Sequence, residues 1–208
     1  MNYLVPCTRL IITAGAWTPR VFATLFPSSR LRIPISSLAG HSVVLRSPRW
    51  AKEHEAGGCH AVFTTDPAGY SPEVFSRMGG EIYLAGLNDA SLPLPDVPTD
   101  AKPSPESIAV LMKTSKRILG LPTGVDDLEV LKEGLCFRPV TAKGPPILCR
   151  ISDDKLGGVK TRGGGNGGVF ISAGHGPWGI SQSLGTGKVL AELIEGKPTS
   201  ANIRYLSL

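Results

Sequence analysis

The chain has 208 residues and a formal net charge of +5 at pH 7, a length that suits one large domain or two small ones. Glycine and proline are frequent, with 25 and 18 residues, yet 41% of the chain is hydrophobic. This balance excludes a bundle of long helices and a disordered chain, and it indicates a loop-rich folded protein. Because the basic residues are scattered singly along the chain, we expect no nucleic acid partner.

Cysteine spacing and hydropathy bear on the cellular compartment. The cysteines Cys7, Cys59, Cys136 and Cys149 form no CxxC pair, so their spacing predicts neither a zinc site nor a dense disulfide scaffold and fits a reducing compartment. The N-terminal segment lacks the pattern of a signal peptide, and no stretch reaches the ~18 apolar residues of a membrane span. We therefore expect a cytoplasmic protein with no membrane span and no metal site.

The first half of the chain predicts strands. Residues 10–15 form a short apolar run that ends in small residues, which is typical of a strand buried on both faces that leads into a tight turn. Such a strand needs neighbours on each side, so its place near residue 1 predicts that the chain begins inside a domain. Segments 42–45, 61–65 and 81–86 predict an antiparallel sheet with hairpins.

Two helices are predicted. The first follows the proline-rich connection 91–105, with Ser104 as its cap, Pro105 in its first position and Gly120 at its end. The second covers residues 179–195, and its apolar and small residues share one face, against which we expect another element to pack closely. The residues of that face are Ile180, Leu184, Gly187, Ala191 and Ile194.

Three further strands are predicted between and before the helices. Residues 135–141 and 146–149 form two of them, joined by a turn at 143–145. Residues 169–173 form the third, which breaks at Gly174–Gly179 directly into the second helix. Free N–H groups at such a junction can hold an anionic or electron-rich ligand atom, although a glycine-rich connection without chemical purpose predicts the same pattern.

Two glycine motifs resemble nucleotide sites without fitting them. Gly163, Gly165 and Gly168 satisfy GxGxxG but precede a strand, whereas a dinucleotide fingerprint lies between a strand and a helix. Residues 185–188 resemble a phosphate loop, but Val189 stands where a Ser or Thr must bind magnesium. We expect a flexible loop in the first case and no nucleoside triphosphate site in the second.

Five motifs in a fixed order carry a family resemblance. They are AGAW, GH, FRPVT with GPPIL, GVFISAGHGPWG and SLGTGKVLAELIEG. The series resembles the C-terminal part of FAD-dependent oxidoreductases of the D-amino-acid oxidase and glycine oxidase type, and it covers essentially the whole chain.

The resemblance implies an α/β (α+β) fold with a mixed-sheet substrate domain, residues 31–160, and an incomplete FAD-binding domain formed by the two chain ends, residues 1–30 and 161–208. The strand–GxGxxG–helix unit that would hold the ADP half of FAD is missing near the N-terminus. We expect a truncated sequence whose remainder lies upstream. The alternative is a remnant that no longer binds FAD.

The resemblance also implies the site residues. Arg138 matches the arginine that receives a substrate carboxylate, a role suited to the two parallel hydrogen bonds of a guanidinium. Without the resemblance, an outward-facing arginine or a structural ion pair is the simpler interpretation. The residues expected to bind the cofactor are Ala14, Gly15, Ala16, Trp17, Gly174, His175, Gly176, Pro177, Trp178, Gly179 and Ile180.

The implied function is oxidation of a C–N bond of an amino acid or secondary amine, with FAD as the cofactor and a small-molecule amine or amino acid as the partner. Because hydride leaves a neutral amine in this chemistry, His175 is assigned to the cofactor shell and no catalytic side chain is named. His41, His54 and His60 lack ligand-like spacing and are interpreted as surface or packing residues. The competing class is a non-catalytic interaction protein that retains the fold.

Overall fold

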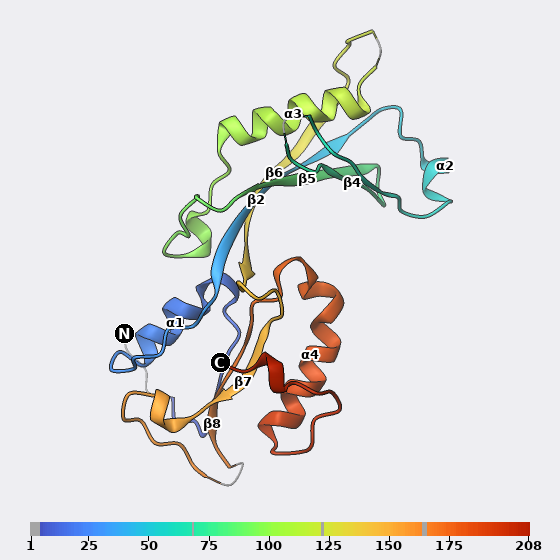
Figure 1. The fold of residues 1–208 in the computed structure, drawn as a ribbon. Coiled ribbons are helices and arrows are strands. Elements are labelled where there is room, and N and C mark those ends of the chain that lie inside the picture. The colour runs from blue at the N-terminus through green and yellow to red at the C-terminus, as the bar shows by residue number, and fades with distance from the viewer. Residues whose placement is uncertain (1–4, 68, 122, 164–165) are drawn as a thin grey trace. The chain divides into compact units, whose positions relative to one another are not determined.

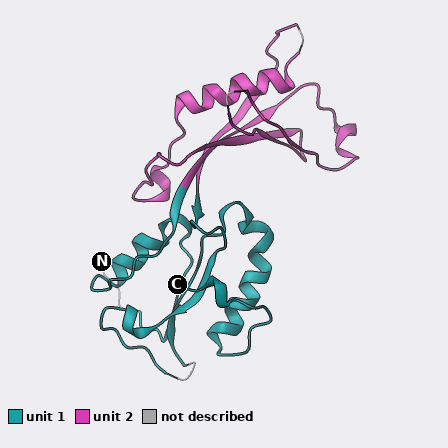
Figure 2. Ribbon diagram, in the orientation of Figure 1, with its two compact units in different colours: residues 1–37, 138–208 teal, residues 38–137 magenta. Residues whose placement is uncertain are grey.

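The computed structural model describes residues 5–67, 69–121, 123–163 and 166–208 (Figure 1). They form two compact units (Figure 2): unit 1 holds residues 1–37 and 138–208, and unit 2 holds residues 38–137. Unit 1 contains a three-stranded sheet and unit 2 most of a five-stranded sheet, each beside its own hydrophobic core. Helices and sheets occur together, and the three-stranded sheet is mixed, so the predicted α/β (α+β) class is confirmed.

The central strand of unit 1 is β8 (Gly168–Ala173), and all six of its residues are buried. It pairs in parallel with β1 (Arg9–Ile12) and antiparallel with β7 (Ile147–Ile151). An apolar strand with neighbours on both sides is buried on both faces, and the prediction of such a strand at 169–173 is confirmed.

The first strand differs from its prediction. In β1 only Ile12 is buried, and Ile11 is 45% exposed. The reason is position, because β1 lies at the edge of the three-stranded sheet and has β8 as its one strand partner among the described residues. The burial expected from the apolar sequence is therefore incomplete in this chain.

Unit 1 also contains α1 (Thr18–Leu25), which the sequence analysis missed. Pro19 stands at its start, where a missing N–H costs nothing. Phe22 and Phe26 enter the core of unit 1, and their ring centroids lie 5.1 Å apart. This helix holds the segment that follows β1 against the sheet.

The C-terminal helix α4 (Gly179–Ile194) has nearly its predicted bounds, but most of its predicted packing face is uncovered in the described structure. Ile180 is 93% exposed and Leu184 is 88% exposed, whereas Val189 is buried. The helix contacts β7 and β8 through another face. The part of the predicted face at Ile180 and Leu184 is thus exposed in the described structure, whereas Ile194 is half-buried.

Solvent-exposed apolar side chains promote association between copies of a protein. Replacing Ile180 and Leu184 with glutamine is expected to lower self-association of the protein without changing its circular dichroism spectrum, because neither side chain contributes to the core. Light scattering across a concentration series measures the effect. An unchanged association constant would show that copies of the chain meet through another surface.

Unit 2 confirms the predicted antiparallel sheet. Its strand order is β3-β4-β5-β2-β6, and the β3–β4, β4–β5 and β2–β5 pairs are antiparallel. The strands are β2 (Ser36–Arg46), β3 (Ala61–Phe63), β4 (Glu73–Arg77), β5 (Glu81–Asp89) and β6 (Glu129–Val140). The sequence analysis missed β4, which has a short and partly exposed pattern.

The two strands predicted at 135–141 and 146–149 exist but do not form a hairpin. β6 belongs to the five-stranded sheet and β7 to the three-stranded sheet. Residues 31–37 and 138–160 accordingly lie in unit 1 with the chain ends, whereas the expected middle domain covered 31–160. Strand pairing over long sequence separations sets these boundaries, and a local pattern does not contain it.

The helix predicted after the proline-rich connection is α3 (Pro105–Leu119), and its predicted ends are confirmed. The Ser104 hydroxyl accepts a hydrogen bond from the Ser107 N–H at 3.3 Å. Ile108 and Leu111 are buried in the core of unit 2. α2 (Lys52–Glu55) is a single short turn.

Replacing Ser104 with alanine is expected to lower the free energy of unfolding by ~1 kcal/mol, the usual loss when a capping hydroxyl is removed. Denaturant titration measures it. Ser107→Ala is the matched control, because it keeps the backbone N–H that Ser104 caps and places a good helix former in the first turn. A control that loses as much stability as Ser104→Ala would contradict the capping role.

His41 is a buried packing residue of unit 2, as expected. It is 2% exposed, and its Nε2 accepts a hydrogen bond from the Ser104 N–H at 3.1 Å. Its Nδ1 is buried without a hydrogen-bond partner among the described residues. Burial lowers the pKa of His41 below its usual value, and the nearby Asp89 carboxylate opposes this shift only in part. The neutral form of His41 is therefore favoured in the folded protein.

A histidine with a lowered pKa makes stability depend on pH. Well above the ordinary pKa of 6.5, His41 is neutral in both the folded and the unfolded chain, so it adds no pH dependence to the stability. As the pH falls below that value, the unfolded chain takes up the proton first, so the free energy of unfolding should decrease. His41→Gln, whose side-chain oxygen can accept the Ser104 N–H, should reduce the slope in denaturation curves. Burial also lowers the pKa of His175, so part of the slope should remain.

Candidate functional site

The carboxyl ends of β1 and β8 lie at one edge of the unit 1 sheet. The two strands are parallel, and Ile12 pairs with Ile171. The segments that follow them, 14–17 and 174–180, therefore leave the sheet side by side. Ligands of open α/β sheets bind at the carboxyl ends of the strands, so two of the predicted cofactor segments meet where this rule places a site.

The strand that carries Arg138 reaches the same edge. Val140, the last residue of β6, forms an antiparallel bridge with His175. Arg138 lies two residues earlier and is half-buried. Alternate residues of a strand share a face, so Arg138 and Val140 lie on the same face of β6. The structure thus brings together all three segments that the sequence analysis singled out.

The turn after β8 depends on its glycines. Gly174 is buried with φ +91°, and a Cβ added to it would lie 2.7 Å from Thr141 Cγ2. Gly176 has φ +56°. L-residues rarely adopt this region, so the chain can enter α4 in this way only through glycine. The predicted glycine break between strand and helix is confirmed.

The segment after β1 has a similar tight turn. Gly15 has φ +56°, and the Trp17 N–H donates to the Ala14 carbonyl at 3.0 Å. Ala16 is buried and Trp17 is half-buried. Across the edge, Trp178 is 62% exposed. The site therefore combines backbone polar groups with accessible aromatic and apolar side chains.

His175 has a partner that the sequence analysis missed. Its Nε2 lies 3.1 Å from the Thr186 hydroxyl, and burial lowers the pKa of His175 below its usual value. The imidazole is therefore neutral at neutral pH. Thr186 gave no distinguishing signal, because it lies within the segment that resembles a phosphate loop and that segment is helical.

The GxGxxG motif at residues 163–168 leads into a strand, as expected. Gly168 is the first residue of β8, Gly163 accepts a hydrogen bond from the Asn166 N–H at 3.2 Å, and Gly165 lies outside the described residues. No helix follows this motif, so the condition for a dinucleotide turn is not met.

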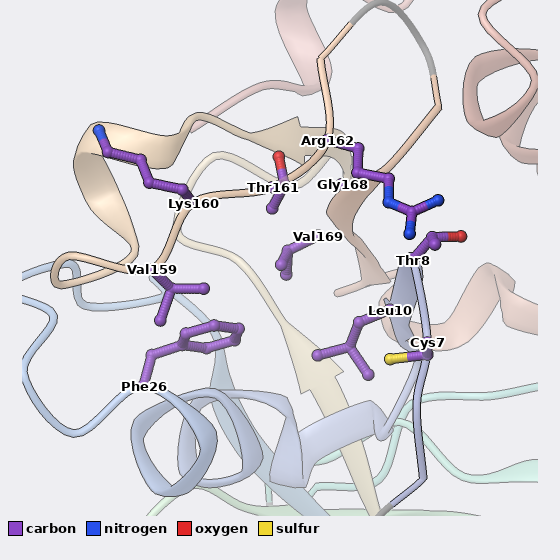
Figure 3. Close-up of a pocket in the computed structure, with 10 residues that line it drawn as sticks. All are labelled: Cys7, Thr8, Leu10, Phe26, Val159, Lys160, Thr161, Arg162, Gly168 and Val169. Atoms are coloured by element: carbon purple, nitrogen blue, oxygen red, sulfur yellow. The ribbon is translucent and has the colours of Figure 1, made fainter.

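A pocket of about 330 Å³ lies at the opposite ends of β1 and β8 (Figure 3). Phe26 and Val159 lie close together on one side of it, and Arg162 lies beside Thr8 on another (Figure 3). Leu10 and Val169 also line it. Because it opens at the amino ends of the parallel strands, it is separate from the predicted cofactor residues.

Two features are absent from the described residues. No helix among them combines the length and the apolar character required to cross a bilayer. The same part of the chain contains no group of three His, Cys, Asp or Glu side chains placed to hold a metal ion.

Known proteins resemble this chain over nearly its whole length. It is 30% identical to a Schizosaccharomyces pombe protein named as an oxidoreductase, over 96% of this chain and 45% of that protein. It is 24% identical to the D-amino acid dehydrogenase of Paramagnetospirillum magneticum, over 95% of this chain and 39% of that protein. The chain thus spans less than half the length of these relatives.

Solved structures share the fold. Glycine oxidase from Geobacillus kaustophilus has a TM-score of 0.69 at 21% identity, over 96% of this chain and 45% of that one. Iminodiacetate oxidase from Chelativorans sp. BNC1 also has a TM-score of 0.69, at 20% identity, over 98% of this chain and 46% of that one. The family model described as FAD dependent oxidoreductase matches residues 4–193. The chain therefore belongs to this DAO family of FAD-dependent oxidoreductases.

Proposed function

We propose that this chain supplies the isoalloxazine and substrate part of an FAD-dependent site that oxidises a C–N bond of an amino acid or secondary amine. The observation that carries the proposal is the meeting of segments 14–17 and 174–180 with the strand of Arg138 at one sheet edge. In the same proposal, unit 1 is the FAD-binding part and unit 2 the substrate domain.

The residues at this edge fit the ring end of FAD. Gly176 places a residue without a side chain just before α4, where the helix dipole favours negative charge. The described residues provide no strand–GxGxxG–helix unit for the ADP end. We propose that this end is held by polypeptide outside the 208 residues, in keeping with the greater length of the relatives.

Each chain residue has a limited task in this proposal. FAD, when bound, accepts the hydride that leaves the substrate carbon. Arg138 binds the substrate carboxylate and orients the C–N bond. Backbone N–H groups at the start of α4 favour the negative charge that accompanies reduction. Because burial lowers the pKa of His175, its imidazole is neutral at neutral pH, and the backbone N–H groups provide this stabilisation without a charged side chain.

The names of similar proteins support the substrate class. Glycine oxidase, iminodiacetate oxidase and D-amino acid dehydrogenase all take their names from amines that carry a carboxylate. A substrate carboxylate suits the planar guanidinium of Arg138, which lies near the end of β6. A non-catalytic interaction protein is the second candidate, favoured by the exposed stripe on α4.

A flavin titration tests the proposal. If the chain contacts only the flavin ring, then FAD, FMN and riboflavin should bind with similar dissociation constants, because the described residues hold no phosphate loop. Quenching of flavin fluorescence or a shift of flavin absorbance measures the binding. Anaerobic addition of glycine or a secondary amine acid should then bleach bound flavin. A folded protein that binds none of the three flavins would refute the proposal and favour the interaction protein.

A further inference from the structure

The turn between β8 and α4 is held from two directions through one residue. The backbone of His175 bridges to Val140 at the end of β6. The ring of His175 contacts the hydroxyl of Thr186, with 3.1 Å between Nε2 and Oγ1. Thr186 lies in α4 about two helical turns from its start. His175 therefore connects the end of β6 to the body of α4.

This contact gives a role to one residue of segment 185–188, which resembles a phosphate loop but does not form one. Gly185, Thr186 and Gly187 lie in the helix interior, where glycine and threonine are weak helix formers. A Cβ at either glycine would meet no atom within 4 Å, so neither glycine is required by packing in the described structure. The Thr186 side chain, in contrast, is partly buried and has a specific partner.

A hydroxyl suits this position because of its two roles. It can donate to a neutral Nε2 or accept from a protonated Nε2, whichever form the ring adopts. Valine has the same branched shape and can do neither. The contact therefore persists whichever nitrogen carries the hydrogen, and it is lost only when the hydroxyl is removed.

We propose that Thr186 is a positioning residue that acts through His175, fixing the β8–α4 turn against the end of β6 so that the turn backbone and the Arg138 strand keep one arrangement. The consequence for flavin rests on the proposed function, since the turn is the proposed contact of the ring. The hold on the turn itself is a property of the chain without flavin.

Three variants of the full chain test this role. Thr186→Val removes the hydroxyl and keeps the shape, and Thr186→Ser restores the hydroxyl. Ser183→Ala is the matched control, because Ser183 lies on the same helix and its hydroxyl donates to the Ile180 carbonyl at 2.8 Å, away from His175. In each variant without flavin, the measurements are amide hydrogen exchange of residues 174–176 and 178–180 and the ¹⁵N resonance of His175 Nε2.

In Thr186→Val, exchange in the turn is expected to accelerate about fivefold, the change that matches loss of one side-chain hydrogen bond. The Nε2 resonance should move as well. The Ser variant and the Ser183→Ala control should both resemble the unaltered chain. Unchanged exchange and resonance in Thr186→Val would overturn the proposal, as would equal acceleration throughout β8 and α4, which indicates a general loss of stability.

Riboflavin titration then separates this inference from the proposed function. Thr186→Val is expected to bind riboflavin about fivefold more weakly, with affinity restored in Thr186→Ser. Faster exchange with unchanged affinity would overturn the positioning role toward the flavin. If the unaltered chain binds no flavin, the proposed function fails, and the exchange and resonance data still decide whether Thr186 holds the turn.

Discussion

Replacing Arg138 with leucine is expected to weaken carboxylate-bearing amine substrates far more than flavin. Arg138 is half-buried near the end of β6, two residues before the bridge to His175. Removing one partner of a desolvated, hydrogen-bonded charge pair costs ~2–5 kcal/mol, which is roughly 30-fold to several thousand-fold in affinity. The ratio of kcat/KM for amines with and without a carboxylate, measured in the flavin-loaded enzyme, gives the effect.

The conservative variant and the flavin titration serve as controls. Arg138→Lys should recover only part of the loss, because an ammonium is a point charge and lacks the planar fork of a guanidinium. The dissociation constant of flavin should change little in either variant. Equal losses for substrates with and without a carboxylate would show that Arg138 supports the fold, and the substrate assignment would then be abandoned.

Local chemistry explains which elements could be predicted from the sequence. The ends of α3 follow from local residues: a capping serine before the helix, a proline at its first position and a glycine directly after it. β8 follows from an uninterrupted apolar run. Sheet membership is different, because β6 and β7 look alike as sequence and join different sheets. That choice depends on distant partners: β7 pairs with β8 across the whole loop between them, and β6 lies beside β2, which is much further away in the sequence.

The sequence predicted which segments form the candidate site, but it did not predict the contacts between them. The glycine turn and the Arg138 strand each carry a sequence pattern, and the structure places them together through the His175–Val140 bridge. The Thr186–His175 contact joins a helix interior to a turn and leaves no pattern in either. The face of α4 shows a further limit, because an apolar stripe indicates that a face can be covered and does not say that its partner lies within these 208 residues.

Replacing Gly174 with alanine is expected to destabilise unit 1 and to remove flavin binding together with it. Alanine at φ +91° is strained, and its Cβ would lie 2.7 Å from Thr141 Cγ2 and 3.6 Å from Ile35 Cγ1. Backbone strain and overpacking each cost about 1–3 kcal/mol, so the free energy of unfolding should fall by ~2–5 kcal/mol. Denaturant titration at constant pH measures the loss.

Gly185→Ala provides the matched control, because it makes the same chemical change in an ordinary helical conformation. The added Cβ meets no atom within 4 Å, and alanine in a helix interior is more stable than glycine by about 0.5–1 kcal/mol. The two substitutions should therefore change stability in opposite directions. A Gly174→Ala variant as stable as the unaltered chain would show that Thr141 and Ile35 move aside freely, and the strict requirement for glycine after β8 would be wrong.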